Sequence, residues 1–247
     1  MYIHSAKYFS FLYNNKTEVC EQVKCITNLL SKKAGRILEV GGGTGALSIE
    51  LAKMGHEVTT LEESPVFFGI LLDKFKSEQF LNPFLTPLPL KLQDLSTEES
   101  YDVIVASRVV SSMPKTEWKV FFACAYKALK TSGFFVFDCS LVNKTRPQQS
   151  LQEIQKKIYG HNSLHHLASS SLLESGDCQE VYFKFVIKRK NMTLVEEEES
   201  HFVHLGTLDE LRNSLRDTGF SNVCMYANWD LAALPEVPSS TLIVAYV

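Results

Sequence analysis

Residues 36–46 read RILEVGGGTGA, and this stretch decides the fold. The apolar run Arg36–Val40 is typical of a buried strand, and a glycine-rich loop follows it without a break. The next residues, 46–54 (ALSIELAKM), have helical spacing and end at Gly55. Glycine permits a tight turn and a close approach of the backbone to a ligand, and a helix start offers unpaired N–H groups. We therefore predict a strand, a ligand-binding loop and a helix, in that order.

The same alternation continues along the chain. Further apolar runs predict strands at 57–61, 88–93, 101–107 and 133–138. Helical spacing occupies the segments at 17–33, 65–75 and 115–130. Strands that alternate with helices predict an α/β, Rossmann-like fold with a doubly wound, mostly parallel sheet. Two last strands, at 221–226 and 241–247, have no helix between them, so we expect seven strands with the last one antiparallel.

The chain divides into four parts by this pattern. We expect an N-terminal helical lid at 1–33, a cofactor-binding α/β core at 34–140, an α+β substrate cap inserted at 141–206, and a C-terminal helix and hairpin at 207–247 that complete the core sheet. Within the cap we expect a helix near 148–159 and two long strands at 180–205. The histidines at 161, 165 and 166 are expected in a solvated loop between them.

Composition and charge limit the classes of partner that we expect. The 247 residues are 45% hydrophobic, carry a net charge of −3, and have scattered lysines and arginines, so we expect no nucleic-acid partner. No apolar stretch approaches membrane-spanning length and no secretory signal is visible, so we expect no membrane partner. The six cysteines have no metal-ligand spacing, which favours a reduced, cytoplasmic protein without a metal. The oligomeric state stays open.

Two carboxylates are expected near the glycine loop. Glu62 ends the second predicted strand and Asp94 the third, so both lie at the carboxyl edge of the sheet, where open α/β sheets bind ligands. A carboxylate at the second strand can accept both hydroxyls of a ribose, which predicts a ligand that contains a nucleoside.

Two families of nucleoside cofactor remain open from the residues alone. Gly41, Gly43 and Ala46 satisfy the dinucleotide pattern G-x-G-x-x-A, and Tyr126 and Lys130 form the Y-x-x-x-K pair of short-chain reductases. An NAD(P)-dependent oxidoreductase is therefore the alternative. Two observations disfavour the oxidoreductase. Tyr126 and Lys130 lie before the fifth strand, too early in the chain for the reductase pair, and the glycine loop lacks the later glycines of the reductase pattern T-G-x-x-x-G-x-G.

The loop also reads E-x-G-x-G-x-G, from Glu39 to Gly45. In the stretch ILEVGGGTGALSIELA the chain resembles the class I S-adenosylmethionine-dependent methyltransferases. The resemblance extends to VTTLEESP at 58–65, LQDL at 92–95, YDVIVAS at 101–107 and GFFVFD at 133–138, and it covers about residues 34–140 and 207–247. It implies S-adenosyl-L-methionine as the cofactor.

The resemblance implies a role for each matching position. Glu39 would lie near the methionine ammonium, Glu62 would hold the ribose hydroxyls, and Ala106 and Ser107 would form the floor below the sulfonium. The complete implied cofactor set is Glu39, Gly41, Gly42, Gly43, Gly45, Glu62, Glu63, Asp94, Leu95, Ala106 and Ser107. Many relatives carry histidines after the fourth strand where this chain has Ser111 and Ser112, so a general base is not implied there.

The acceptor side is expected outside the core. The stretch KYFSFLY at 7–13 resembles the aromatic lid of small-molecule N- and O-methyltransferases, which makes Tyr8 and Tyr13 candidate catalytic residues. His201 lies in ESHFVHLGTLDEL, which is similar to a segment of aminosugar- and glycine-type N-methyltransferases, and is the third candidate.

Glu196–Glu199 has two interpretations, a solvated strand edge or an acidic gate for a cationic amine. The predicted function is methyl transfer to a small molecule, with an amine preferred over a hydroxyl. A cofactor-binding interaction protein without activity is the third hypothesis.

Overall fold

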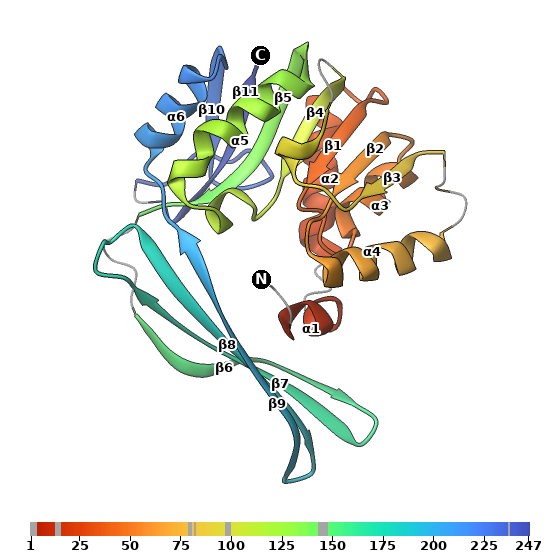
Figure 1. Cartoon of the computed structure of the whole chain (residues 1–247), viewed down its shortest axis with the longest axis vertical. Helices are drawn as coiled ribbons and strands as arrows, with labels where there is room; N and C mark the ends of the chain where they lie inside the picture. The colour runs from red at the N-terminus through yellow and green to blue at the C-terminus, as the bar shows by residue number, and fades with distance from the viewer. Residues whose placement is uncertain are drawn as a thin grey trace.

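Figure 1 shows an α/β body joined to a slender antiparallel sheet. The computed structural model describes residues 4–12, 16–78, 81, 83–96, 100–142, 148–236 and 238–247. Helix α1 (His4–Leu12) lies at the junction of the two sheets, where it contacts strands of the second sheet and helix α4 (Pro65–Ser77).

The body contains a seven-stranded sheet in the order β10-β11-β5-β4-β1-β2-β3. Its strands are β1 (Arg36–Val40), β2 (Glu57–Leu61), β3 (Leu85–Leu88), β4 (Tyr101–Ala106), β5 (Leu129–Ser140), β10 (Asn222–Tyr226) and β11 (Ser240–Tyr246). The first five are parallel to one another, whereas β11 is antiparallel to both β5 and β10. The predicted doubly wound, mostly parallel sheet is confirmed.

Helices cover both faces because successive strand residues point to opposite sides. Ile37 and Val103 join a cluster under α2 (Lys16–Leu29) and α3 (Ala46–Lys53). Their neighbours Leu38 and Ile104 join a second cluster under α5 (Lys115–Ala128) and α6 (Leu208–Asp217). The near-continuous apolar runs of the central strands are what a sheet buried on both faces requires.

The third strand is shorter and earlier than the sequence predicts. It ends at Leu88, before Pro89, and Leu92–Asp94 forms a 3₁₀ helix (η2). As an edge strand β3 tolerates Pro87 within it, and its ladder ends at the pair Leu61–Leu88, where its partner β2 also ends. The expectation that Asp94 ends the third strand is therefore wrong.

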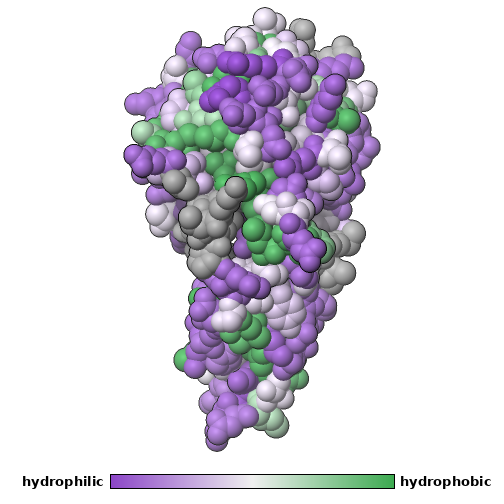
Figure 2. Space-filling model, turned by 90° about the vertical axis from the view of Figure 1, so that its left-hand side faces the viewer, coloured by the Kyte–Doolittle hydropathy of each residue, from purple (hydrophilic) through white to green (hydrophobic). Residues whose placement is uncertain are grey.

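The second sheet contains four antiparallel strands in chain order and is inserted between β5 and α6. Its strands are β6 (Gln149–Tyr159), β7 (Asn162–Leu172), β8 (Cys178–Arg189) and β9 (Met192–His204). Figure 2 shows this part tapering away from the body, with hydrophobic patches among hydrophilic side chains. We call residues 148–206 of this insertion the cap sheet.

Two predictions for the cap sheet are wrong. The segment expected as a helix near 148–159 is β6, because hydrogen bonding to β7 along its length overrides its weak helical pattern. The loop expected around the three histidines is a hairpin: His161 lies in its turn, His165 lies in β7, and His166 is fully buried against the Phe185 ring.

The cap sheet begins and ends at one point of the core. Leu141 forms a parallel bridge with Gly206, and the Gly206 N–H donates to the Ser140 carbonyl at 2.9 Å. The chain therefore leaves β5 and returns toward α6 at neighbouring positions.

Candidate active site

The glycine loop turns back over the end of β2. The N–H groups of Gly41 and Gly42 both donate to the Leu61 carbonyl, at 2.8 and 2.9 Å. A Cβ at Gly42 would lie 2.0 Å from Thr60 Oγ1, so only glycine fits there. Gly43 is different: its φ is +55°, yet no described atom lies within 4 Å of the place of a Cβ. The loop therefore has open space on one side, at Gly43.

Glu62 lies directly beside this open space. Its Oε2 accepts a 2.8 Å hydrogen bond from the Gly43 N–H, and its Oε1 accepts a 2.7 Å bond from the Ser64 N–H. Burial raises the pKa of the Glu62 carboxyl. Each carboxylate oxygen can accept a second hydrogen bond, so the group can still bind hydroxyls of a ligand.

Glu39 lies on β1, beneath the glycine loop. Its Oε2 accepts hydrogen bonds from the Ser48 and Thr60 hydroxyls, the second at 3.2 Å. Burial raises the pKa of Glu39 to about 7, while the two hydroxyl bonds oppose the shift. A buried carboxyl of this kind is well suited to a cationic partner, since a positive charge would stabilise its ionised form.

Of the remaining predicted cofactor residues, some lie at the carboxyl edge of the sheet and others are exposed on the surface. Ala106 is fully buried at the carboxyl end of β4, and Ser107 follows it. Asp94 is exposed at the end of η2 and Leu95 is half-buried beside it. Glu63 is exposed and pairs with Lys91 at 3.2 Å. The structure thus brings the β1, β2 and β4 residues to one edge of the sheet.

A group of residues that the sequence did not assign lies next to Ser107. Ser107 Oγ accepts a 3.0 Å bond from Gln22 Nε2 and donates a 3.3 Å bond to Asp138 Oδ2. Asp138 Oδ1 accepts from the Arg108 N–H at 2.5 Å. The sequence contained one signal for this group: Gln22 is a polar residue on the apolar face of the helix predicted at 17–33. In the structure its side chain is buried, with 5% exposed.

Tyr8 and His201 each lie against a glutamate of β9, on the face of the cap sheet where α1 packs. Tyr8 Oη donates to Glu197 Oε2 at 2.7 Å, and its ring lies 5.0 Å from that of Phe185. Burial, together with this bond, raises the pKa of Tyr8. His201 Nε2 lies 2.9 Å from Glu199 Oε1. Tyr13 lies outside the described residues.

The four glutamates of β9 divide by the alternation of the strand. Glu196 and Glu198 bind Lys184 on the outer face. Glu197 binds Lys7 and Tyr8, while Glu199 accepts the N–H groups of His4 and Ser5 at 2.9 Å each. Two of the four therefore hold the start of α1 on the cap sheet.

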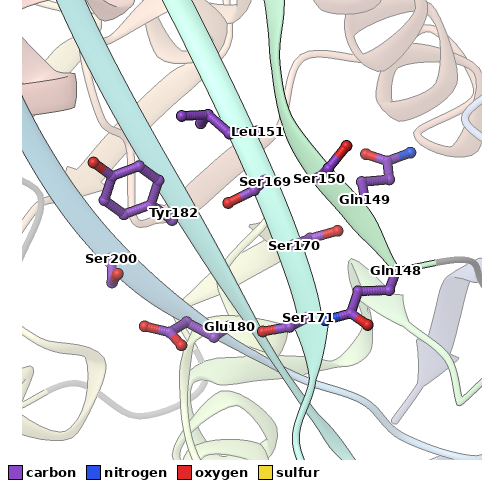
Figure 3. Close-up of a pocket in the computed structure, with 10 residues that line it drawn as sticks. All are labelled: Gln148, Gln149, Ser150, Leu151, Ser169, Ser170, Ser171, Glu180, Tyr182 and Ser200. Carbon is purple, nitrogen blue, oxygen red and sulfur yellow. The ribbon is translucent and has the colours of Figure 1, made fainter.

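A groove of about 390 Å³ lies on the cap sheet (Figure 3). Its lining comes from residues of the insertion, including Ser169, Tyr182 and Ser200. Tyr182 pairs with Ser200 one residue from the Val181–His201 pair, so this groove and His201 are on opposite faces. The groove is therefore separate from the glycine loop.

Two further observations concern the described part of the chain. No helix in it is long and apolar enough to cross a membrane. Its histidine, cysteine and acidic side chains form no group of three or more that could hold a metal ion.

The reductase pair lies at the other edge of the sheet. Lys130 Nζ donates to Asp102 Oδ1 at 2.8 Å, at the start of β4. The Tyr126 ring packs edge-on against Phe220, with centroids 5.3 Å apart. Neither side chain faces the glycine loop, because the loop follows the carboxyl end of β1.

Comparisons with known proteins agree with this geometry. A family model described as a methyltransferase domain matches residues 12–225. A putative methyltransferase from Geobacillus sp. strain WCH70 is 25% identical over 210 residues, which are 84% of this chain and 81% of that protein.

Solved structures of other proteins are similar over nearly the whole chain. An S-adenosylmethionine-dependent methyltransferase from Clostridium acetobutylicum has a TM-score of 0.80 at 13% identity, with 98% of this chain and 97% of that chain covered. The sugar N-methyltransferase KedS8 from a Streptoalloteichus species has a TM-score of 0.77 at 13% identity, with 99% and 92% covered. Both likenesses show the fold, whereas the family match extends over most of the sequence. The chain belongs to the methyltransferase-domain family.

Proposed function

We propose that this protein transfers the methyl group of S-adenosylmethionine to a small molecule. The observation that carries the proposal is the open space at Gly43 together with the Glu62 carboxylate, which accepts a hydrogen bond from the Gly43 N–H. Backbone with free space beside it, and a carboxylate with spare acceptor capacity, fit the ribose and amino-acid parts of this cofactor.

The chain's own residues would hold the donor from several strands. Glu39 would face its ammonium group, Glu62 its ribose hydroxyls, and Asp94 and Leu95 its adenine. Ala106 and Ser107 would lie beneath its sulfonium, which supplies an electrophilic methyl group. Transfer is an in-line displacement, so positioning of donor and acceptor supplies much of the rate.

We infer that the acceptor is an amine. A neutral amine needs no strong base at the transfer step, and this chain has serines at 111 and 112, after β4. Ser111 itself is engaged, because its Oγ accepts the Ser140 N–H at 2.7 Å. The similar KedS8 structure is that of a sugar N-methyltransferase, which favours an amino sugar or a related amine.

The acceptor would bind between the core and the wall formed by α1 and the cap sheet. In this proposal residues 1–33 act as a lid, 34–140 hold the donor, 141–206 form the substrate cap, and 207–247 complete the core. Tyr8, Tyr13 and His201 would orient the acceptor. Tyr8 lies on α1 and its partner Glu197 on β9, so reorientation of α1 would release the Tyr8 hydroxyl for this role. A cytoplasmic location without a nucleic-acid partner goes with a small-molecule substrate.

Calorimetric titration with S-adenosylhomocysteine, with NADP⁺ as the control ligand, tests the donor. We expect binding of S-adenosylhomocysteine alone, at about micromolar Kd. Binding of NADP⁺ alone would contradict the proposal and favour the oxidoreductase alternative.

Transfer of radiolabelled methyl from S-adenosylmethionine tests the acceptor, with a panel of amino sugars matched to hydroxyl analogues. We expect label on the amines. Label on the hydroxyl analogues alone would contradict the amine proposal but keep the methyltransferase. Binding without transfer to any member would favour the interaction-protein hypothesis.

A further inference from the structure

Asp138 lies near the carboxyl end of β5, beside the residues that follow β4. Both of its oxygens are engaged there: Oδ1 accepts the Arg108 N–H at 2.5 Å, and Oδ2 accepts the Ser107 hydroxyl at 3.3 Å. One carboxylate therefore fixes the main chain of one residue and the side chain of the residue before it.

Helix α2 holds the same two residues from the other side. Gln22 Nε2 donates to Ser107 Oγ at 3.0 Å. Arg108 Nη2 donates to both oxygens of Glu18, at 2.6 and 2.7 Å. Glu18 and Gln22 are four residues apart, so they lie on one face of the helix. Ser107 and Arg108 are thus held between α2 and β5 by hydrogen bonds from both elements.

The backbone of Arg108 has a strained conformation, which indicates that these contacts impose it. Its φ is +59°, in the left-handed region that residues with a Cβ disfavour. Such a conformation persists only where the surroundings determine it, and such positions cluster at functional sites. Here it directs the Arg108 N–H at Asp138.

We propose that Asp138 is a positioning residue for methyl transfer: it fixes Ser107, one of the two floor residues of the donor site, together with the neighbouring Arg108, and it links that floor to α2. This inference rests on the proposed function, because the floor matters for transfer only if a donor binds above it. In the proposed function the sulfonium and its methyl group would lie above this floor. Loss of Asp138 should therefore affect S-adenosylmethionine more than S-adenosylhomocysteine, which lacks that methyl group.

The chain contains a matched control at the opposite edge of β4. Asp102 Oδ2 accepts the Arg36 N–H at 2.8 Å, and Oδ1 accepts Lys130 Nζ at 2.8 Å. Asp102 therefore also joins a backbone N–H to a side chain, but far from the carboxyl ends of the strands. Asp102→Ala removes a similar clamp without touching the proposed floor.

The first experiment is amide hydrogen exchange on the full-length Asp138→Ala, Asp138→Asn and Asp102→Ala proteins. We expect Asp138→Ala to speed exchange in segment 107–112 by about fivefold or more, since a hydrogen bond to a charged group is lost. Asp138→Asn should lie between it and the wild type, because one amide oxygen can still accept the Arg108 N–H. Asp102→Ala should leave that segment unchanged. Equal exchange in Asp138→Ala and the wild type would overturn the proposal.

The second experiment is calorimetric titration of the same proteins with each ligand. We expect Asp138→Ala to weaken S-adenosylmethionine binding by about tenfold, to weaken S-adenosylhomocysteine binding less, and Asp102→Ala to change neither by more than about twofold. Equal losses of affinity for both ligands, or the same losses in Asp102→Ala, would overturn the positioning role and show that Asp138 only stabilises the fold. If the wild type bound neither ligand, the proposed function and the positioning role would both fall, while exchange would still decide whether Asp138 holds the loop.

Discussion

The backbone N–H of Gly43 donates to Glu62 Oε2 at 2.8 Å, across 19 residues of chain. This bond joins the loop after β1 to the loop after β2, at the edge where parallel strands present their carboxyl ends. It also places the carboxylate beside the open space at Gly43. The proposed donor site is therefore organised around this bond.

Replacement of Glu62 by alanine should weaken binding of S-adenosylhomocysteine by about tenfold or more, because ribose hydroxyls would lose their acceptor. Calorimetry measures the effect. Glu57→Ala, at the amino end of the same strand, is the control; the Glu57 side chain is exposed and pairs with Arg36. Unchanged affinity in a folded Glu62→Ala protein would show that the donor lies elsewhere.

Gly43→Ala separates backbone strain from loss of space. Gly43 and Gly55 both have positive φ, +55° and +87°, and both have no described atom within 4 Å of a Cβ. Alanine at either position should therefore cost about 1 kcal/mol of folding free energy. Only Gly43→Ala should also weaken S-adenosylhomocysteine binding. Equal affinity in the two variants would mean that the space at Gly43 is not used by the ligand.

Glu39 should make the protein less stable as pH rises. Its folded pKa is about 7, above its ordinary value near 4.5. Between these values the native state binds more protons than the unfolded state, so the free energy of unfolding falls with increasing pH. Asp138, whose pKa burial raises to about 6, adds a slope of the same sign. Urea unfolding from pH 5 to 8 should show a smaller decrease in Glu39→Gln than in the wild type; an identical slope would contradict the assignment.

Glu199 should contribute in the opposite direction. Burial raises its pKa, but hydrogen bonds from His201, Ser5 and His4 outweigh burial and lower the pKa to about 2. The stabilisation is therefore fully present above about pH 4.5 and is lost as the pH falls toward 2.

Glu199→Gln should consequently loosen α1 at neutral pH, with a loss of about 1–3 kcal/mol. Amide exchange in residues 4–12 measures this loss. Glu198→Gln, which affects the Lys184 pair on the other face, is the control. Equal protection of α1 in both variants would show that Glu199 does not hold the helix.

The core and its glycine loop could be predicted because their signals are local. The run RILEV, the glycines after it and the helix at 46–54 are contiguous, and the fold follows from repetition of this unit. The family resemblance rested on the same residues and is confirmed over residues 12–225.

The cap sheet and the Asp138 cluster depend on contacts between distant segments. Segment 149–159 forms a strand because β7 pairs with it, and nothing within the segment specifies that partner. Gln22 and Ser107 are 85 residues apart, and Ser107 and Asp138 are 31 apart. Each of these residues has an ordinary local context, so only the tertiary fold brings them together.

The bridge between Leu141 and Gly206 has a consequence for divergence within the family. An insertion whose two ends meet can change its length, strand pairing and surface without displacing the strands on either side of it. The proposed donor site on β1, β2 and β4 and the proposed acceptor wall on β8 and β9 would thus be separable modules of one chain. On this proposal, new acceptor specificity would arise by substitution in the cap sheet while the donor site stayed the same.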